Sequence, residues 1–199
     1  MSGDAPRIAV IVLAAGRSTR MGATNKLVAD IGGTPMVRRV VEAALASKAA
    51  PVLVVTGHMA EEVSSALAGH NVTFVANQDY ATGLASSLKA GIGALPPSCD
   101  GVLILLGDMP QIAPDHLDRL IAAFATDTIV VPVHEGRQGN PVLWPARIFP
   151  ELLQLDGDAG AKRLIAVHAA SVREVDLGTD AIFADIDTPE ALARVRGRG

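Results

Sequence analysis

The segment LAAGRSTRMG near the N-terminus combines two glycines with two arginines, directly after the apolar run RIAVIV. Gly16 and Gly22 let backbone N–H groups approach an anion closely. Arg17, Arg20 and the nearby Lys26 place three cations within ten residues. Guanidinium forks and an ammonium group suit phosphate oxygens. The segment therefore predicts a polyphosphate site, with a solvated strand-to-helix loop as the alternative, although it matches neither G-x-G-x-x-G nor G-x-x-x-x-G-K-[ST].

Two aspartates far apart in the sequence are candidate metal ligands. Asp108 follows the apolar run GVLILL. A carboxylate there can hold Mg²⁺, which prefers one or two carboxylates together with phosphate and water oxygens, although Gly-Asp is also an ordinary turn pair. Asp187 in DIDTPEAL is the second candidate, and Asp185 would point to the same side of an extended segment. DIDTPEAL alone is also typical of a helix N-terminus capped by Asp187 or Thr188.

A third group of candidates lies in the run NQDYATGLASSLKAG. Gly83 is expected at the start of a helix, with Ser86 and Ser87 in or near its first turn. Backbone N–H groups and hydroxyls at a helix N-terminus suit a ribose or the edge of a base, and simple helix capping is the alternative. The motifs GNP at 139–141 and GDAGAK at 157–162 are Gly-rich and polar, and each alone is equally typical of a turn.

The elements that must position these residues are short aliphatic strands alternating with amphipathic helices. The strand candidates, apolar on both faces like strands of a buried parallel sheet, are residues 8–13, 52–56, 72–76, 101–106 and 128–133. Helical patterns occupy residues 35–47, 59–69, 83–95 and 114–125. The alternation predicts a doubly wound α/β sheet, in which ligands bind beyond the carboxyl ends of the strands. After residue 134 the regular alternation of strands and helices ends. This part of the chain contains the apolar run PVLW, a predicted helix near 160–168, a predicted strand at 172–176 and a predicted helix from Pro189.

Composition narrows the class of protein. With 199 residues, 49% hydrophobic and only 3% aromatic, the chain predicts a single domain, residues 1–199, with an aliphatic core. The net charge of −4 gives no footprint for nucleic acid or an anionic membrane, and no segment approaches the about 18 apolar residues of a membrane span. Cys99 is the single cysteine, which favours an intracellular, cytoplasmic protein. Zinc and serine-hydrolase motifs do not occur.

Taken together, the ordered motifs LAAGRSTRMGATNK, GLASSL, GDMP, GNP, GDAGAK and DIDTPEAL resemble those of the MobA-like nucleotidyltransferases, most closely the molybdenum cofactor cytidylyltransferase branch. The likeness runs from Ile8 to about Leu192. It implies a Rossmann-like, three-layer α/β sandwich, whose mostly parallel sheet has an antiparallel strand in its second half. It also implies catalytic roles for Arg17, Lys26 and Asp108, and Mg²⁺ binding by Asp108 and Asp187. The implied nucleotide-binding residues are Leu13, Ala14, Ala15, Gly16, Arg17, Ser18, Arg20, Met21, Gly22, Lys26, Gly83, Ser86 and Ser87.

The reaction that this resemblance implies is transfer of CMP from CTP to the terminal phosphate of molybdopterin or the molybdenum cofactor, with release of pyrophosphate. Ala15 favours CTP over GTP, because guanylyltransferases of the family tend to read LAGG where this chain reads LAAG. A phosphate monoester is already anionic near pH 7, so positioning and charge neutralisation can replace a strong general base. The implied recipient of the product is an enzyme of the xanthine dehydrogenase type.

Three alternatives remain open at this point. A sugar-phosphate or small-alcohol-phosphate nucleotidyltransferase uses a similar first loop. A nicotinamide-dependent oxidoreductase predicts G-x-G-x-x-G and an acidic residue at the end of the second strand, where this chain reads VVTGH. A non-catalytic module that binds the molybdenum cofactor is disfavoured by the presence of both Asp108 and Asp187.

Overall fold

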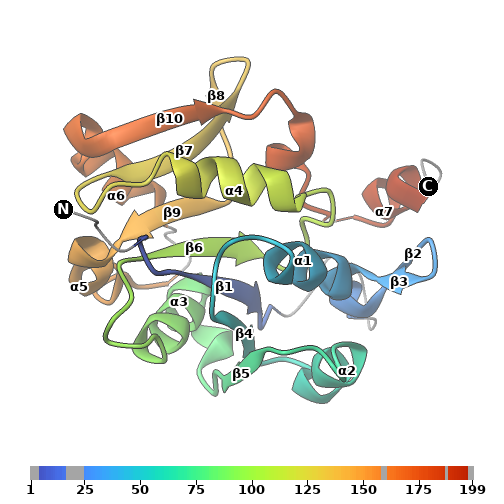
Figure 1. Ribbon diagram of the computed structural model, residues 1–199. Helices are drawn as coiled ribbons and strands as arrows, with labels where there is room; N and C mark the ends of the chain where they lie inside the picture. Colours follow the sequence, from blue (N-terminus) through green and yellow to red (C-terminus); the bar gives the residue numbers. More distant parts are fainter. Residues whose placement is uncertain (1–4, 17–24, 158–160, 187, 197–199) are drawn as a thin grey trace.

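A computed structural model describes residues 5–16, 25–157, 161–186 and 188–196. An eight-stranded sheet forms its centre, in the order β10-β7-β9-β6-β1-β4-β5, with β8 paired to β7 (Figure 1). The strands are β1 (Ile8–Ala14), β4 (Val52–Thr56), β5 (Thr73–Ala76), β6 (Gly101–Leu106), β7 (Ile129–His134), β8 (Arg137–Gln138), β9 (Val142–Pro145) and β10 (Val172–Asp176).

The sheet is mostly parallel, as predicted. β6, β1, β4 and β5 are parallel neighbours, and β10 is parallel to β7. β9 runs antiparallel to β6 and β7, which confirms an antiparallel strand in the second half. The short strand β8 is also antiparallel to β7, because the chain reverses at Glu135 and Gly136, both with positive φ (50° and 72°).

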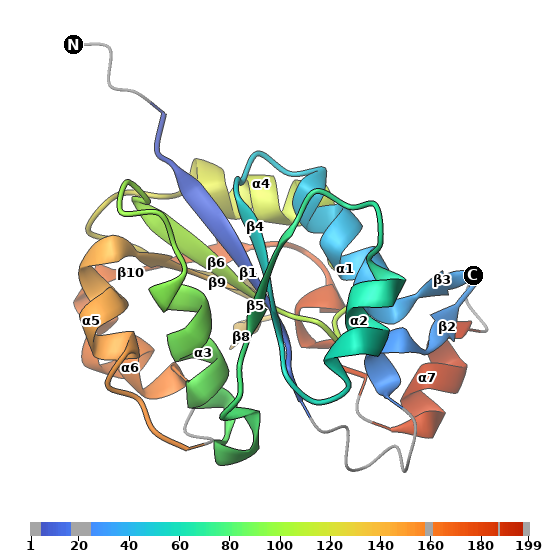
Figure 2. The ribbon, with the colours of Figure 1, turned by 90° about the horizontal axis from the view of Figure 1, so that it is seen from below.

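Helices cover both faces of the sheet (Figure 2). One face is covered by α1 (Met36–Leu45), α2 (Ala60–Ala66) and α4 (Pro114–Ala122), the other by α3 (Leu84–Gly93), α5 (Phe149–Leu152) and α6 (Lys162–Val167). In β1, Val12 packs into the same cluster as Val40 of α1. Its neighbour Leu13 belongs to the opposite cluster with Leu88 of α3. Alternate side chains of the strand thus bind the two helical layers to the sheet.

Smaller elements complete the chain. The helix α7 (Pro189–Arg196) contacts the hairpin of β2 (Asp30–Ile31) and β3 (Thr34–Pro35). Ile31, Ile186 and Leu192 share a small hydrophobic cluster there. The 3₁₀ turns are η2 (Lys26–Val28), η3 (Tyr80–Thr82), η4 (Ala146–Ile148), η5 (Ala169–Ser171) and η6 (Asp180–Phe183). Within the described ranges, no helix has the length and apolar character needed to cross a bilayer.

The strand at 73–76 differs from its prediction. It was expected to be buried on both faces, but β5 is the last strand of the sheet and most of its side chains are exposed, including Phe74 at 42%. An apolar run is the same whether a strand lies in the middle of a sheet or at its edge, and only the strand order distinguishes the two. The other four strands of that set are almost completely buried.

Candidate functional site

The carboxyl ends of four parallel strands meet at one edge of the sheet. β1 ends at Ala14, β4 at Thr56, β5 at Ala76 and β6 at Leu106. Because these strands are parallel neighbours, the residues that follow them must lie along the same edge. The predicted first loop follows β1 and the GDMP motif follows β6. The described beginning of that loop, up to Gly16, is therefore adjacent to the GDMP motif, although about 90 residues of chain separate them.

Lys26 and Asp108 form the charged centre of this edge. Lys26 Nζ lies 2.7 Å from Asp108 Oδ2, and the two side chains are only 12% and 17% exposed. Lys26 is held by the η2 turn, where Asn25 Oδ1 accepts a hydrogen bond from Leu27 N at 3.1 Å. Asp108 is held by Gly107, whose N–H donates to Leu13 O at 3.0 Å. A Cβ at residue 107 would also lie 3.0 Å from that oxygen, so a glycine suits this close approach.

The segment before the DTP motif lies directly beside Asp108. Ile186 N donates to Asp108 O at 3.0 Å. The GNP motif contacts the same part of the chain, because Asn140 N donates to Ile182 O at 3.0 Å. A Cβ at Gly139 would lie 2.5 Å from that same carbonyl oxygen. The GDMP and GNP motifs thus both make backbone contacts with residues 182–186, which lead into the DTP motif.

The helix-capping interpretation of DIDTPEAL is confirmed for Thr188. Thr188 Oγ1 accepts a hydrogen bond from Ala191 N at 3.2 Å, in the first turn of α7. Asp187 itself lies outside the described residues. Asp185 is described and exposed, and its neighbour Ile186 makes the contact with the GDMP motif.

The first loop is described only at its beginning. Leu13, Ala14 and Ala15 are buried, with Ala15 only 3% exposed. A Cβ at Gly57, which follows β4, would lie 2.9 Å from Ala15 Cβ and 2.6 Å from Tyr80 Cβ. The methyl group of Ala15 therefore packs toward the end of β4. The predicted nucleotide-binding residues Arg17, Ser18, Arg20, Met21 and Gly22 lie outside the described residues.

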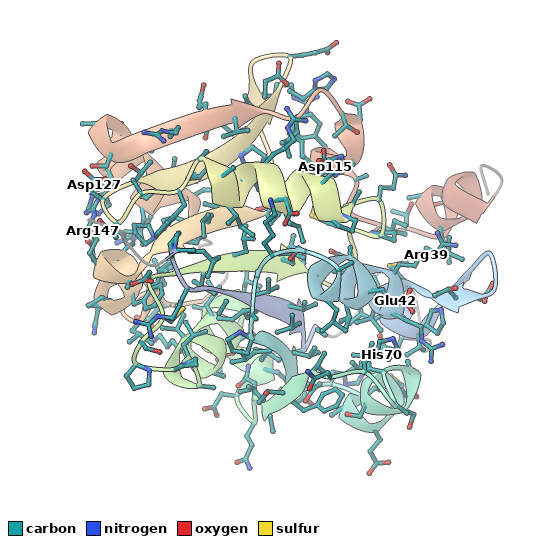
Figure 3. All side chains as sticks on the ribbon, in the orientation of Figure 1. Arg39, Glu42, His70, Asp115, Asp127 and Arg147 are labelled. Atoms are coloured by element: carbon teal, nitrogen blue, oxygen red, sulfur yellow. The ribbon has the colours of Figure 1, made fainter. Side chains whose placement is uncertain are left out.

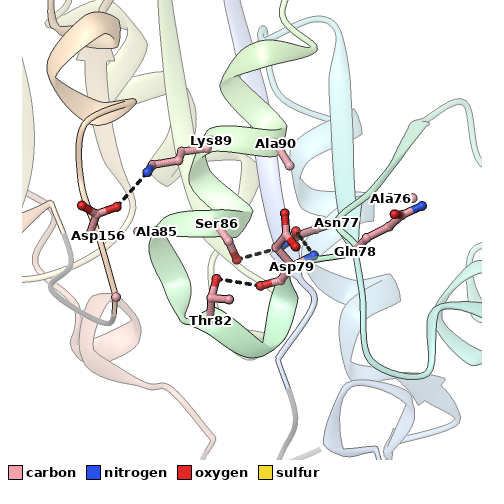
Figure 4. A pocket seen from close by; sticks show the side chains of 11 residues that line it. Ala76, Asn77, Gln78, Asp79, Thr82, Ala85, Ser86, Lys89, Ala90 and Asp156 are labelled. Carbon is pink, nitrogen blue, oxygen red and sulfur yellow. Dashed lines mark hydrogen bonds and ion pairs between the residues drawn. The ribbon is translucent and has the colours of Figure 1, made fainter.

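The predicted nucleoside segment forms a corner between β5 and α3 (Figure 4). Gly83 precedes α3 with φ 116° and ψ 177°, a conformation largely restricted to glycine. Ser86 Oγ donates to Gly83 O at 2.8 Å. Asn77 Nδ2 donates to Ser86 Oγ at 2.9 Å and to Ser87 Oγ at 3.0 Å. Both serine hydroxyls thus contact Asn77, which the sequence analysis did not single out.

A polar cavity of about 590 Å³ opens beside this corner. Figure 4 shows Asn77, Ser86 and the ion pair between Lys89 and Asp156, with Nζ and Oδ1 2.9 Å apart. The first residue of the GDAGAK motif, Gly157, also lines the cavity, and its carbonyl accepts a hydrogen bond from Ala85 N at 3.0 Å. The fold therefore brings two motifs that are weak in isolation to the same cavity.

Ionisable groups elsewhere have recognisable structural contacts (Figure 3). His70 Nε2 lies 3.4 Å from Glu42 Oε1, and Arg147 donates to Asp127 O at 2.7 Å. Cys99 is buried, and this burial raises the pKa of its thiol, which makes it a poor nucleophile. Among the residues with described placement, no three His, Cys, Asp or Glu side chains group together as a metal cage.

Comparison with known proteins identifies the family. The model of the MobA-like NTP transferase domain matches residues 10–174. The purine catabolism protein PucB of Bacillus subtilis is 35% identical over 96% of this chain and 97% of its own. The molybdenum cofactor cytidylyltransferase of Escherichia coli is 28% identical over 94% of this chain and 95% of its own. The bifunctional protein GlmU of Kineococcus radiotolerans is 35% identical over 94% of this chain, but over only 38% of its own length.

Solved structures agree with this comparison. Rv0371c from Mycobacterium tuberculosis has a TM-score of 0.87 and 29% identity, over 97% of this chain and 99% of that one. A structure of the same protein in complex with manganese gives 0.84 and 27%, over 97% and 100%. The family model covers most of the chain. The chain therefore belongs to the MobA-like NTP transferase family, which is a family of nucleotidyltransferases.

Proposed function

We propose that this protein transfers CMP from CTP to the terminal phosphate of a molybdopterin-type acceptor and releases pyrophosphate. The observation that carries the proposal is the 2.7 Å contact between Lys26 Nζ and Asp108 Oδ2 at the carboxyl edge of the central strands. Nucleotidyl transfer needs a cation for phosphate oxygens and a carboxylate for a divalent ion, and this pair supplies both. The choice of CTP rests on Ala15 and the family resemblance, and the E. coli relative supports the pterin acceptor.

Lys26 would bind the triphosphate and stabilise the departing pyrophosphate. Its ammonium group has three N–H donors, so it can keep its contact with Asp108 while it donates to a phosphate oxygen. Its positive charge is held in place by the η2 turn before substrate arrives, which is the condition for effective electrostatic stabilisation of a transition state. Arg17 and Arg20 would share this role.

Asp108, with Asp187 as the second ligand, would hold Mg²⁺. The fit rests on the donor chemistry: the Asp108 carboxylate is a hard oxygen ligand, largely shielded from water, at the place where phosphates would bind. When bound, the ion supplies neutralisation of the charge on the reacting phosphates. The manganese complex of Rv0371c supports a divalent ion in this family but leaves its identity a prediction.

The chain's own residues would mainly position the reactants. Gly16 is exposed just after β1, and a Cβ there would meet no atom of the described residues within 4 Å, so substrate can approach its backbone. Gly83, Ser86 and Ser87 would form the nucleoside side of the site. The acceptor phosphate is already anionic near pH 7, so attack on the α-phosphate requires alignment rather than proton removal by a side chain.

Activity assays that combine different nucleoside triphosphates with different phosphate acceptors test the proposal. Pyrophosphate release would be measured with each of CTP, GTP, UTP and ATP, with molybdopterin and with Mg²⁺ or Mn²⁺. Turnover with CTP and molybdopterin is the expected result. A preference for GTP would indicate a guanylyltransferase instead. The melting temperature of the protein with each nucleotide provides a second measurement. If NAD(P) raises it and no triphosphate does, the transferase proposal fails.

A second candidate is transfer to a sugar phosphate or a small-alcohol phosphate. It is favoured by the 35% identity to the GlmU protein over 94% of this chain. The same assays with sugar 1-phosphates as acceptors distinguish the two functions, because turnover with UTP and a sugar phosphate, and none with molybdopterin, would replace the first proposal. Delivery of the product to a xanthine dehydrogenase-type enzyme and a cytoplasmic location stay predictions.

A further inference from the structure

Asn77 is buried, although the residues of β5 that precede it in the chain are mostly exposed. It directly follows this edge strand, yet Asn77 itself is only 6% exposed. Its backbone N–H donates to Thr56 O at 2.8 Å and so extends the pairing of β5 with β4 by one residue. A carboxamide is costly to bury unless its polar atoms are hydrogen-bonded. Its burial there therefore requires specific partners.

The Asn77 side chain has such partners on both of its polar atoms. Oδ1 accepts from Asp79 N at 2.9 Å, and Nδ2 donates to Ser86 Oγ and Ser87 Oγ. Aspartate could keep the first bond but has no N–H donors for the other two. These three hydrogen bonds together therefore require an amide side chain at residue 77.

The direction of each bond is also defined. Ser86 Oγ uses its hydrogen to donate to Gly83 O, so it must accept from Asn77, and the N–H of Asp79 requires Oδ1 on the other side. The carboxamide thus connects the backbone just after β5 to the first turn of α3. The η3 turn and Gly83 lie between these two anchors.

This corner lies on the same edge of the sheet as Asp108. Three strand spacings, β6 to β1 to β4 to β5, separate the two positions, or about 14 Å. A nucleoside triphosphate whose phosphates contact Lys26 can extend along this edge toward the corner. The corner is thus at the place where the base and ribose would end.

We propose that Asn77 is the positioning residue of the nucleoside half of the site. It sets the backbone of residues 78–83, which receives the base and ribose, while the hydroxyls of Ser86 and Ser87 hold Asn77 rather than the ligand. The proposal rests on the proposed function only in taking a nucleoside triphosphate as the ligand. Asn77 is not predicted as a site residue from the sequence, and the role of the two serines is indirect.

Binding measurements with two probes test the proposal. CTP carries a nucleoside and inorganic tripolyphosphate does not, so the dissociation constants of both, with Mg²⁺ present, separate the two halves of the site. In Asn77→Asp and Asn77→Ala, which lose two and three of these hydrogen bonds, we expect CTP to bind about five- to thirtyfold more weakly. Tripolyphosphate should change less than twofold. In turnover assays KM for CTP should rise while kcat changes little.

Variants of the serine partners and of an exposed asparagine complete the test. Ser86→Ala combined with Ser87→Ala removes both acceptors with little change of volume, and should reproduce the loss seen in Asn77→Ala. Asn71→Asp makes the same chemical change at an exposed position and should leave both dissociation constants unchanged. If the Asn77 variants fail to fold, Ser87→Ala alone decides the question, because Ser87 is buried and is not among the described residues that line the cavity, so weaker binding of CTP must act through Asn77.

The outcomes separate this proposal from the proposed function. If the wild-type protein binds CTP, and the Asn77 and serine variants bind it equally well, the positioning role is wrong and the transferase proposal stands. Equal weakening of CTP and tripolyphosphate would indicate a general loss of structure and would also overturn the positioning role. If the wild-type protein binds none of CTP, GTP, UTP and ATP, both proposals are rejected.

Discussion

Lys26 and Asp108 lie 82 residues apart in the sequence, and their side chains meet at 2.7 Å. The contact joins the end of the first loop to the end of β6, the two places where the sequence predicts phosphate and metal binding. Because both side chains are largely shielded from water, the charge of each is compensated mainly within the protein. The contact therefore places a cation and an anion in fixed positions before any substrate arrives.

Replacing Asp108 by Asn tests whether this carboxylate takes part in the reaction. The amide has nearly the same shape and can still accept from Lys26, so the protein should still fold, although the uncompensated charge of Lys26 should lower the melting temperature. Loss of the negative charge should lower kcat by roughly 100- to 1000-fold, the usual size of one preorganised electrostatic contact. It should also weaken Mn²⁺ binding, measured by electron paramagnetic resonance. Asp127→Asn, at an exposed position, is the control, and near-normal pyrophosphate release in Asp108→Asn would refute the metal assignment.

Much of this architecture can be predicted from the sequence, because it depends on local patterns. Aliphatic runs indicate β1, β4 and β6 almost residue for residue, and polar residues directly after such runs indicate where the site is. The exposure of β5 could not be predicted, because it depends on the strand order. Asn77 follows an apolar run just as Asp108 does, and that shared position was the available signal. Its hydrogen bonds to residues nine and ten positions later depend on how the chain turns at Gly83.

Gly57→Ala should destabilise the protein and disturb the nucleotide site. The new methyl group would lie 2.6 Å from Tyr80 Cβ and 2.9 Å from Ala15 Cβ, so at least one of these residues must move. We expect a loss of about 1–3 kcal/mol in the free energy of unfolding, as for other overpacked sites, measured by urea denaturation. Ala15→Gly in the same chain removes only one of the two clashes and should restore part of the loss. A Gly57→Ala protein as stable as the wild type would contradict this packing.

Two glycines of α3 should respond to alanine with opposite signs. At Gly91 the added methyl would lie 2.8 Å from Ile11 Cγ2, in the middle of the core, so Gly91→Ala should lose about 1–3 kcal/mol. At Gly93 it would meet no atom of the part of the chain that the structure describes within 4 Å, so Gly93→Ala should gain up to about 1 kcal/mol from the better helix propensity of alanine. Denaturation midpoints of the two variants provide the measurement. Changes of the same sign would contradict the packing of α3 against β1.

The histidine in the first turn of α4 should make stability depend on pH. Burial lowers the pKa of His116 below its ordinary value of 6.5, and its Nδ1 accepts a hydrogen bond from Ala113 N at 3.1 Å, which requires that nitrogen to be unprotonated. Above pH 6.5 both folded and unfolded chains carry the neutral ring, so the stabilisation is complete. Below about pH 6.5 the unfolded chain takes up a proton first, and the free energy of unfolding must fall.

The comparison of His116→Gln with the wild type isolates this contribution from that of the carboxylates. The free energy of unfolding, measured in urea at half-unit steps from pH 7.5 to 5, should fall more steeply in the wild type than in the variant below pH 6.5. His70→Gln serves as the matched control, since His70 is a second partly buried histidine and its loss should leave the contribution of His116 to the slope in place. If His116→Gln and the wild type show parallel curves over the whole range, the neutral, hydrogen-bonded state of His116 is wrong.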